Sequence, residues 1–309
     1  MTVIPTPLIA VVGPTASGKS SLALEVAQTL GTHGRSAEIV GTDSMQAYRG
    51  MDIGTATPSQ QDQNGIPHHM VNIWQPSEAV SVVEFRDRAR VAIDEIRQRG
   101  ATALVVGGSG LYVRAVLEQL DFPGTDPKVR IKWEHELEQV GAPALHAKLA
   151  QVDPKAAASI EVNNGRRIVR ALEVIELTGG PFIATLPEPV DEYPTTRFGL
   201  RIDRDVLDAR IEHRVEEMWH QGFVDEVRQL EKQGLRAAPT ASAALGYGPI
   251  LDLLAGEITE IEAMQQTIDD TRKFARRQQR WFARDDRIHW WDYDSPDLAP
   301  AIVESVTST

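Results

Sequence analysis

The segment GPTASGKS at residues 13–20 constrains the fold of this chain more than any other. It fits the pattern G-x-x-x-x-G-K-[ST], which needs a strand before it and a helix after it. The apolar run PLIAVVG at 7–13 is typical of a buried parallel strand, and Leu22, Val26 and Leu30 recur at helical spacing over 18–30. The sequence therefore predicts a phosphate-binding loop at the end of a strand.

The residue types of this loop suit a phosphate group. Gly13 and Gly18 permit a tight turn whose N–H groups face one concavity, and the helix that follows adds its positive end. Lys19 can reach phosphate oxygens, and the Ser20 hydroxyl can ligate Mg²⁺. Any diphosphate or triphosphate, ATP included, would satisfy such a loop. We predict that it is built from Gly13, Pro14, Thr15, Ala16, Ser17, Gly18, Lys19 and Ser20.

The rest of the chain indicates an α/β core interrupted by a helical segment. Further strands are expected at 37–44, 101–108 and 195–203, with a helix at 83–100. From 128 to 180 the pattern is helical throughout, and a segment with four prolines follows at 181–194. Later helices are expected at 206–221, 222–233, 243–254 and 260–284. We assign 1–120 and 196–309 to a parallel-sheet core and 121–195 to an inserted helical domain.

Composition excludes several classes of protein. The 309 residues include no cysteine, which excludes disulfides, thiolate zinc sites and a catalytic thiol. No apolar run approaches the ~20 residues of a membrane-spanning helix, and the first residues lack the basic region of a signal peptide. A net charge of −12 argues against a protein that coats nucleic acid through bulk charge. We expect a cytoplasmic protein that contacts no membrane and holds no zinc.

Asp43 follows the strand at 37–44, at the edge of the sheet where ligands bind in open α/β folds. A carboxylate there can hold Mg²⁺, act as a general base or bind a ribose or base edge. The alternative is a turn or helix cap, because TDS is favourable capping sequence. The polar, glycine-rich stretch that follows, at 43–58, favours a functional loop.

At this point several motifs together resemble one family. They are GPTASGKS, DSMQAYRGMDIGTATP, IPHHMVNIWQP, VVGGSGLYVRA, DPKVR, NNGRRIVRALEVIELTG and TRKFARRQQRWF, in this order along nearly the whole chain. The set is similar to that of the tRNA dimethylallyltransferases, also called tRNA isopentenyltransferases. The resemblance implies a kinase-like P-loop core flanked by helices, with an inserted helical domain that binds tRNA.

The resemblance also implies an activity and its residues. The family moves a dimethylallyl group from dimethylallyl diphosphate, with Mg²⁺, to the exocyclic amine of the adenosine just 3′ of the tRNA anticodon. Asp43, Lys19 and Ser109 are then catalytic, with Asp43 accepting the proton of a weakly nucleophilic amine. Residues 15–20 hold the diphosphate. Contact with tRNA is implied for Asp43, Ser44, Met45, Gln46, Ser109, Arg130, Arg166, Arg167, Ile168, Val169 and Arg170. The expected partner is the anticodon stem-loop of tRNA.

Basic residues near the C-terminus form the densest positive cluster of the chain. Over 272–284 their spacing places several on one helix face, suited to phosphates, and we include Arg276 and Arg277 among the tRNA-binding candidates. Trp281 and Phe282 within this cluster are expected to anchor the core. His68 and His69 are expected to make structural hydrogen bonds in the core, because adjacent side chains diverge and bind a shared metal poorly.

Two other functions fit part of this pattern. In a P-loop kinase acting on a small molecule or nucleoside, the loop would hold ATP and Asp43 would activate a hydroxyl, but such an enzyme does not need the basic clusters at 166–170 and 272–284. A non-catalytic switch would bind tRNA without forming product. The sequence favours the transferase, and we expect it to act as a monomer.

Overall fold

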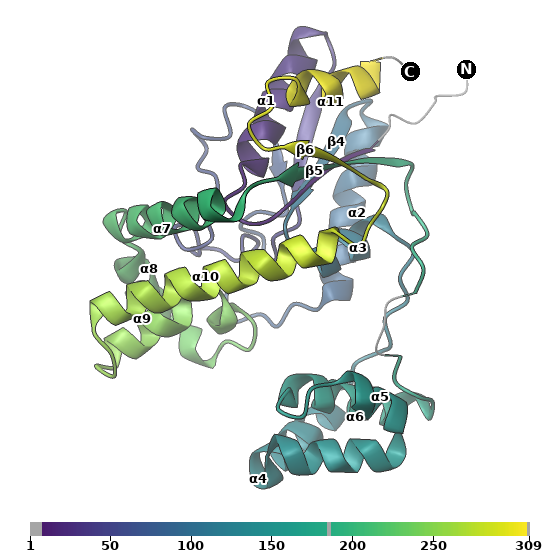
Figure 1. The fold of residues 1–309 in the computed structure, drawn as a ribbon, viewed down its shortest axis with the longest axis vertical. Coiled ribbons are helices and arrows are strands. Elements are labelled where there is room, and N and C mark those ends of the chain that lie inside the picture. The colour runs from purple at the N-terminus through teal and green to yellow at the C-terminus, as the bar shows by residue number, and fades with distance from the viewer. Residues whose placement is uncertain (1–7, 184–186, 308–309) are drawn as a thin grey trace. The chain divides into compact units, whose positions relative to one another are not determined.

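Six parallel strands form one sheet in the described residues of the computed structural model, 8–183 and 187–307 (Figure 1). Their order across the sheet is β3-β2-β4-β1-β5-β6, and each neighbouring pair runs parallel. The strands are β1 (Leu8–Val12), β2 (Ala37–Gly41), β3 (His68–His69), β4 (Thr102–Gly107), β5 (Thr195–Arg201) and β6 (Ile288–Asp292). The sheet confirms the predicted α/β fold class.

Helices cover both faces of this sheet. The described helices are α1 (Lys19–Thr32), α2 (Val82–Gln98), α3 (Gly110–Leu117), α4 (Pro127–Val152), α5 (Pro154–Ser159), α6 (Gly165–Thr178), α7 (Arg204–His220), α8 (Phe223–Lys232), α9 (Tyr247–Leu254), α10 (Glu260–Phe282) and α11 (Leu298–Thr307), with short 3₁₀ turns at Leu235–Ala237 and Ala241–Ala243. No described helix is long and apolar enough to cross a bilayer.

The central strand β1 shows why its sequence is an unbroken apolar run. Leu8, Ala10 and Val12 pack with α2 and α3 on one face. Ile9 and Val11 pack with α1 and α11 on the other. Because both faces are covered, every side chain of the strand is buried, as expected for a strand inside a parallel sheet.

The chain divides into two compact units, Met1–Glu118 with Asp191–Thr309, and Gln119–Val190. The second unit is helical. Its α4 contains a break at Gly141, where φ is 77°, followed by Pro143. This break divides α4 into two helical segments, both within the range 128–180 that is predicted to be helical. Trp133, Leu145 and Leu172 are among the buried side chains that join α4 to α6.

The core unit holds the two ends of this insertion beside each other. Glu118 and Asp191 form an antiparallel bridge, and the Glu192 N–H donates to the Leu117 carbonyl at 2.8 Å. Arg287, which follows α10, donates to Glu118 at 2.5 Å and to Asp191 at 2.8 Å. An ion-pair cluster thus fixes the point where the chain leaves the core and returns.

Four elements were absent from the sequence prediction: α3, α11, β3 and β6. The glycines before α3 conceal its start, and β3 is two residues long. The strand β6 lies at one edge of the sheet, within the segment HWWDYD and the residue before it. His68 and His69 lie on the opposite edge strand and are half-buried, so their predicted place in the core was wrong. Both make structural hydrogen bonds as predicted, His68 with the Ile66 carbonyl at 2.8 Å and His69 with Glu38 at 2.7 Å.

Candidate functional site

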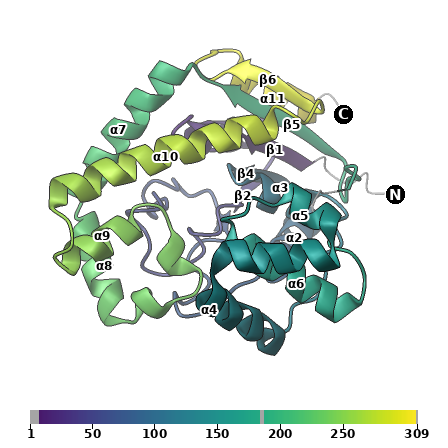
Figure 2. The same cartoon turned by 60° about the horizontal axis from the view of Figure 1, so that its bottom comes forward.

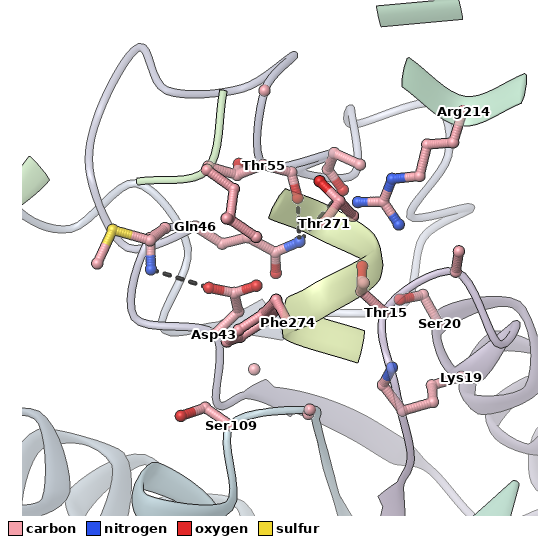
Figure 3. Close-up of a pocket in the computed structure, with 18 of the residues that line it drawn as sticks. Thr15, Lys19, Ser20, Asp43, Gln46, Thr55, Ser109, Arg214, Thr271 and Phe274 are labelled. Atoms are coloured by element: carbon pink, nitrogen blue, oxygen red, sulfur yellow. Dashed lines mark hydrogen bonds between the residues drawn. The ribbon is translucent and has the colours of Figure 1, made fainter. Parts of the chain in front are cut away.

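A cavity of about 740 Å³ opens at the carboxyl edge of the sheet (Figure 3). Its walls come from the 13–20 loop, the 43–58 loop, the turn after β4, and helices α7 and α10. Figures 1 and 2 both show α10 running beside α7 and α9. The cavity gathers residues that are more than 200 positions apart in the sequence, among them Thr15 and Gln278.

The backbone of the 13–20 loop has the shape that its glycines permit. Gly18 caps α1 in the left-handed region with φ of 98°, where a side chain would be strained. Two side chains from distant helices hold the loop in place. Arg210 of α7 donates to the Ala16 carbonyl at 2.8 Å, and Gln278 of α10 accepts from the Thr15 N–H at 2.8 Å.

Lys19 and Arg214 bring positive charge to this loop. Lys19 begins α1, and Arg214 extends from α7 into the same pocket (Figure 3). Burial, with the nearby Arg214 charge, lowers the pKa of Lys19 to about 7, against the opposing effect of Asp43. Burial also lowers the pKa of Arg214. Two basic side chains that line one pocket form a site for an anion with several charges.

Asp43 lies across the pocket from these cations. Thr42 continues the β2–β4 ladder through its N–H bond to the Val106 carbonyl at 2.8 Å, which places Asp43 just past the strand end. The Asp43 side chain is exposed, and the surface that it exposes faces the cavity. Desolvation there raises the pKa of Asp43, although the Met45 N–H, Arg214 and Lys19 oppose the rise. The carboxylate is therefore a stronger base than an ordinary aspartate.

The turn after β4 permits a close approach of three segments. A Cβ atom at Gly107 would lie 1.8 Å from the Thr42 hydroxyl, and one at Gly108 would lie 2.5 Å from the Gln278 amide. Glycine is therefore needed at both positions. Ser109 follows in the pocket wall, with its hydroxyl not used to cap α3. Ser109, which the resemblance implies to be catalytic, therefore lines the same pocket as Lys19 and Asp43.

The candidates from both loops are brought together here. Thr15, Ala16, Gly18, Lys19, Ser20, Asp43, Ser44, Met45, Gln46 and Ser109 all line the cavity. Gly13, Pro14 and Ser17 are buried behind it. Among the described residues no three His, Cys, Asp or Glu side chains could hold a metal ion. Ser20 is exposed in the pocket beside Lys19, and its oxygen is a donor type that Mg²⁺ accepts.

Carboxylates of α7 partly neutralise the basic residues of α10. Arg272 binds Glu212 at 2.6 Å, and Arg276 binds Asp208 at 2.8 Å. Arg277 is exposed, with its guanidinium 5.6 Å from the centre of the Phe274 ring. Trp281 and Phe282 were both predicted to anchor the core, and Phe282 is buried as predicted. Trp281 is 37% exposed, so its prediction as a core anchor was wrong.

In the inserted unit, the arginine candidates differ in their surroundings. Arg130 and Arg170 both bind the fully buried carboxylate of Glu173, at 2.7 and 2.8 Å. Arg170 also donates to backbone carbonyls at the start of the unit. Arg166 and Arg167 are exposed at the first turn of α6.

The implied tRNA contacts of Ile168 and Val169 need correction. These side chains are 0% and 3% exposed, within the apolar core that α6 shares with α4. They lie on the inner side of an amphipathic helix whose first arginines lie on the outer side. Neither side chain is available to an RNA, and their role is to pack α6.

Several pocket residues were not found from the sequence. Arg210, Arg214, Thr271, Phe274 and Gln278 come from α7 and α10, far along the chain from the loops they face. Periodicity predicts these helices but does not predict which turn meets the phosphate loop. Gln278 is 6% exposed, but nothing in the sequence distinguishes it from the neighbouring Gln279.

Comparisons with known proteins place this chain beside one group of enzymes. The family model described as IPP transferase matches residues 46–285. A tRNA dimethylallyltransferase from Thermobifida fusca is 56% identical over 291 residues, which cover 94% of this chain and 91% of that protein. The tRNA isopentenylpyrophosphate transferase of Bacillus halodurans has a TM-score of 0.71 at 38% identity, covering 98% of this chain and 96% of that one. A eukaryotic dimethylallyltransferase described as acting on tRNA has a TM-score of 0.76 at 25% identity, covering 98% of this chain and 77% of that one.

Proposed function

The chain belongs to the tRNA dimethylallyltransferase family, and from this premise we propose which atoms its reaction joins. The enzyme transfers a dimethylallyl group from dimethylallyl diphosphate to the exocyclic amine of the adenosine 3′ of the tRNA anticodon. The bond between the allylic carbon and the diphosphate oxygen breaks, and a carbon–nitrogen bond forms. The observation that carries this proposal is one pocket that holds both a phosphate-binding loop and Asp43.

Asp43 is the general base of this reaction. The lone pair of an exocyclic amine is delocalised into the adenine ring, so the amine must lose its proton as the new bond forms. A carboxylate with a raised pKa, at the pocket wall opposite the cations, suits that task. Ser44, Met45, Gln46 and Ser109 line the same side and would contact the target nucleotide.

The leaving diphosphate is held by the 13–20 loop. Lys19 and Arg214 supply positive charge where the negative charge of the leaving group grows, and the α1 N-terminus adds its dipole. Ser20 would ligate Mg²⁺ together with diphosphate and water oxygens. When bound, this ion supplies further charge stabilisation to the leaving group.

We propose that tRNA binds through Arg166 and Arg167 of the inserted unit and through Arg276 and Arg277 of α10. These guanidinium groups suit phosphate oxygens because each offers several donors at a fixed charge. Arg130 and Arg170 act first on Glu173 and shape the inserted unit. The adenine must leave its stack to reach Asp43, which is less costly in an anticodon loop than in a duplex.

Labelled substrates test the reaction. The protein is incubated with Mg²⁺ and unmodified tRNA, and either labelled dimethylallyl diphosphate or labelled ATP is supplied. We expect label to move from the prenyl donor into tRNA, and we expect none from ATP. Transfer from ATP to a small acceptor, without prenyl transfer, would overturn the proposal in favour of a kinase, an alternative that the comparisons do not favour.

A further inference from the structure

The 43–56 segment between β2 and β3 forms one wall of the pocket without any helix or strand of its own. Asp43, Gln46 and Thr55 all lie on this wall (Figure 3). Backbone N–H groups in such a segment have no ladder or helical partner and must find acceptors elsewhere. The side chains that accept hydrogen bonds from these N–H groups therefore fix the position of the segment.

Glu226 of α8 supplies three of them. Its carboxylate accepts from the N–H groups of Asp52 at 2.9 Å, Ile53 at 2.6 Å and Gly54 at 3.2 Å. The Tyr247 hydroxyl, at the start of α9, donates to the same carboxylate at 2.7 Å. Burial and the neighbouring Glu226 raise the pKa of Tyr247, so its hydroxyl remains a donor at neutral pH. One side chain from a distant helix thus binds three consecutive amides.

Close packing against two aromatic rings also restricts the backbone of residues 52–54. A Cβ atom at Gly54 would lie 2.2 Å from the Phe223 ring and 2.7 Å from the Tyr247 ring. The two rings pack edge to face, with centroids 5.0 Å apart. Both rings are 0% exposed. The aromatic pair and the Glu226 carboxylate therefore both restrict the position of the Gly54 backbone.

This anchor is connected to Asp43 through short links. Thr55 follows Gly54, and the Thr55 and Ala56 carbonyls accept from the Gln46 amide at 3.1 and 3.2 Å. Gln46 stands three residues after Asp43, whose carboxylate accepts from the Met45 N–H at 3.0 Å. The anchored end of the segment and the end with the carboxylate are thus joined across the pocket wall.

We propose that Glu226 is a positioning residue that sets the wall carrying Asp43 and Gln46, and thereby the placement of the target nucleotide. This inference rests on the proposed function of the pocket. Glu226 itself is absent from the pocket lining, so it acts through the segment it binds. A carboxylate is required because both oxygens accept; a glutamine in its place would turn an N–H donor toward an N–H donor.

The test compares Glu226→Gln with Glu231→Gln. Glu231 lies on the same helix and pairs with Arg236 at the surface, 2.7 Å away, without touching the 43–56 segment. Three readouts are measured on each protein: prenyl transfer with tRNA varied, affinity for inorganic pyrophosphate, and hydrogen exchange of the amides at 52–54. Pyrophosphate reports on the 13–20 loop and therefore controls for general damage.

For Glu226→Gln we expect kcat/KM for tRNA to fall ~10- to 100-fold, because misplacement of about 1 Å is enough for such a loss. We expect faster exchange at 52–54 and unchanged pyrophosphate affinity, and for Glu231→Gln we expect wild-type values throughout. Wild-type turnover in Glu226→Gln would overturn the inference, as would a parallel loss of pyrophosphate affinity.

If the Glu226→Gln protein does not fold, a second variant provides the test. Tyr247→Phe keeps the ring beside Gly54 and removes one hydrogen bond from the carboxylate. We expect the same pattern with a smaller fall, and wild-type exchange and turnover in this variant would overturn the inference. Absence of prenyl transfer by the wild-type protein would instead refute the proposed function, and the exchange measurement would still test the anchor.

Discussion

At the scale of single residues, Lys19 and Asp43 are shifted toward their neutral forms. Partial desolvation by the pocket walls lowers the pKa of the lysine and raises the pKa of the aspartate, although Asp43 is exposed to the cavity. Such a site suits a charged substrate, because binding of that substrate changes the protonation of both groups. A diphosphate would favour the protonated lysine, and the loss of a proton from an amine would be favoured by the more basic carboxylate.

Replacing Asp43 by asparagine should separate chemistry from binding. We expect kcat to fall by ~10²- to 10⁴-fold, the usual contribution of a general base, with tRNA affinity little changed. Single-turnover rates on saturating tRNA and a binding titration measure the two effects. Asp62→Asn is the control, because Asp62 is exposed and bonds to Ser59 at 2.6 Å, away from the pocket. Lost tRNA binding with normal turnover would refute the role of Asp43 as base.

The lowered pKa of Lys19 predicts proton uptake when diphosphate binds. With a pKa of about 7, Lys19 is mostly neutral at pH 8 and mostly protonated at pH 6. A bound anion raises this pKa, so binding at pH 8 should take up to about one more proton than binding at pH 6. Pyrophosphate calorimetry in buffers of different ionisation enthalpy measures the uptake.

Lys19→Arg is the matched variant for this experiment. Its guanidinium stays protonated at both values of pH. The pH-dependent difference in uptake should therefore be smaller in Lys19→Arg than in the wild-type protein. Equal uptake by the two proteins would show that Lys19 is already charged before the anion arrives.

At the scale of elements, the ends of β2 and β4 set the position of Asp43. Thr42 and Gly107 lie beside each other at these ends, with no space between them. Gly107→Ala should therefore lower the free energy of unfolding by ~1–3 kcal/mol, the usual cost of overpacking, and should reduce turnover by moving Thr42 and the adjacent Asp43.

Gly248→Ala is the control for this substitution. Gly248 lies in α9 with nothing within 4 Å of its added Cβ atom. Alanine there should keep turnover and raise the free energy of unfolding by up to ~1 kcal/mol through helix propensity. Urea titrations and steady-state rates measure both variants. An unchanged free energy of unfolding in Gly107→Ala would show that the strand ends can separate without cost.

The sequence predicted the parallel core and the turn that joins β1 to α1 because those features are local. A strand, a glycine turn and a helix occupy 8–32 and carry their pattern within that short stretch. It did not predict α3, because the glycines that let Trp281 and Gln278 approach also read as a plain turn. Arg214 and Glu226 could not be found, because their roles depend on which residues meet after 170 or more positions of intervening chain.

At the scale of the whole molecule, the point where the insertion joins the core depends on Arg287. Its guanidinium binds Glu118, which is 1% exposed, as well as Asp191 and Asp285. Arg287→Ala leaves Glu118 paired with Arg114 and should lower the free energy of unfolding by about 3 kcal/mol. Urea titration followed by circular dichroism measures this change.

Arg201→Ala is the comparison for that variant. Arg201 is 64% exposed and 3.7 Å from Asp292, so its removal should cost at most about 1 kcal/mol. If the two variants lose equal stability, the ion-pair cluster at the base of the insertion is no stronger than a surface pair.

The pairing of β1 with β5 has a consequence for synthesis on the ribosome. β1, β2 and β4 are complete before residue 108, but β5 begins at Thr195, after the whole insertion has been made. At ~5–20 residues per second, the ribosome needs several seconds to span that interval. During this interval the apolar strand β1, LIAVV, has one edge without a partner strand. Such an unpaired edge is prone to aggregation. We expect chaperone dependence to be concentrated in nascent chains of this length, and to end once β5 emerges.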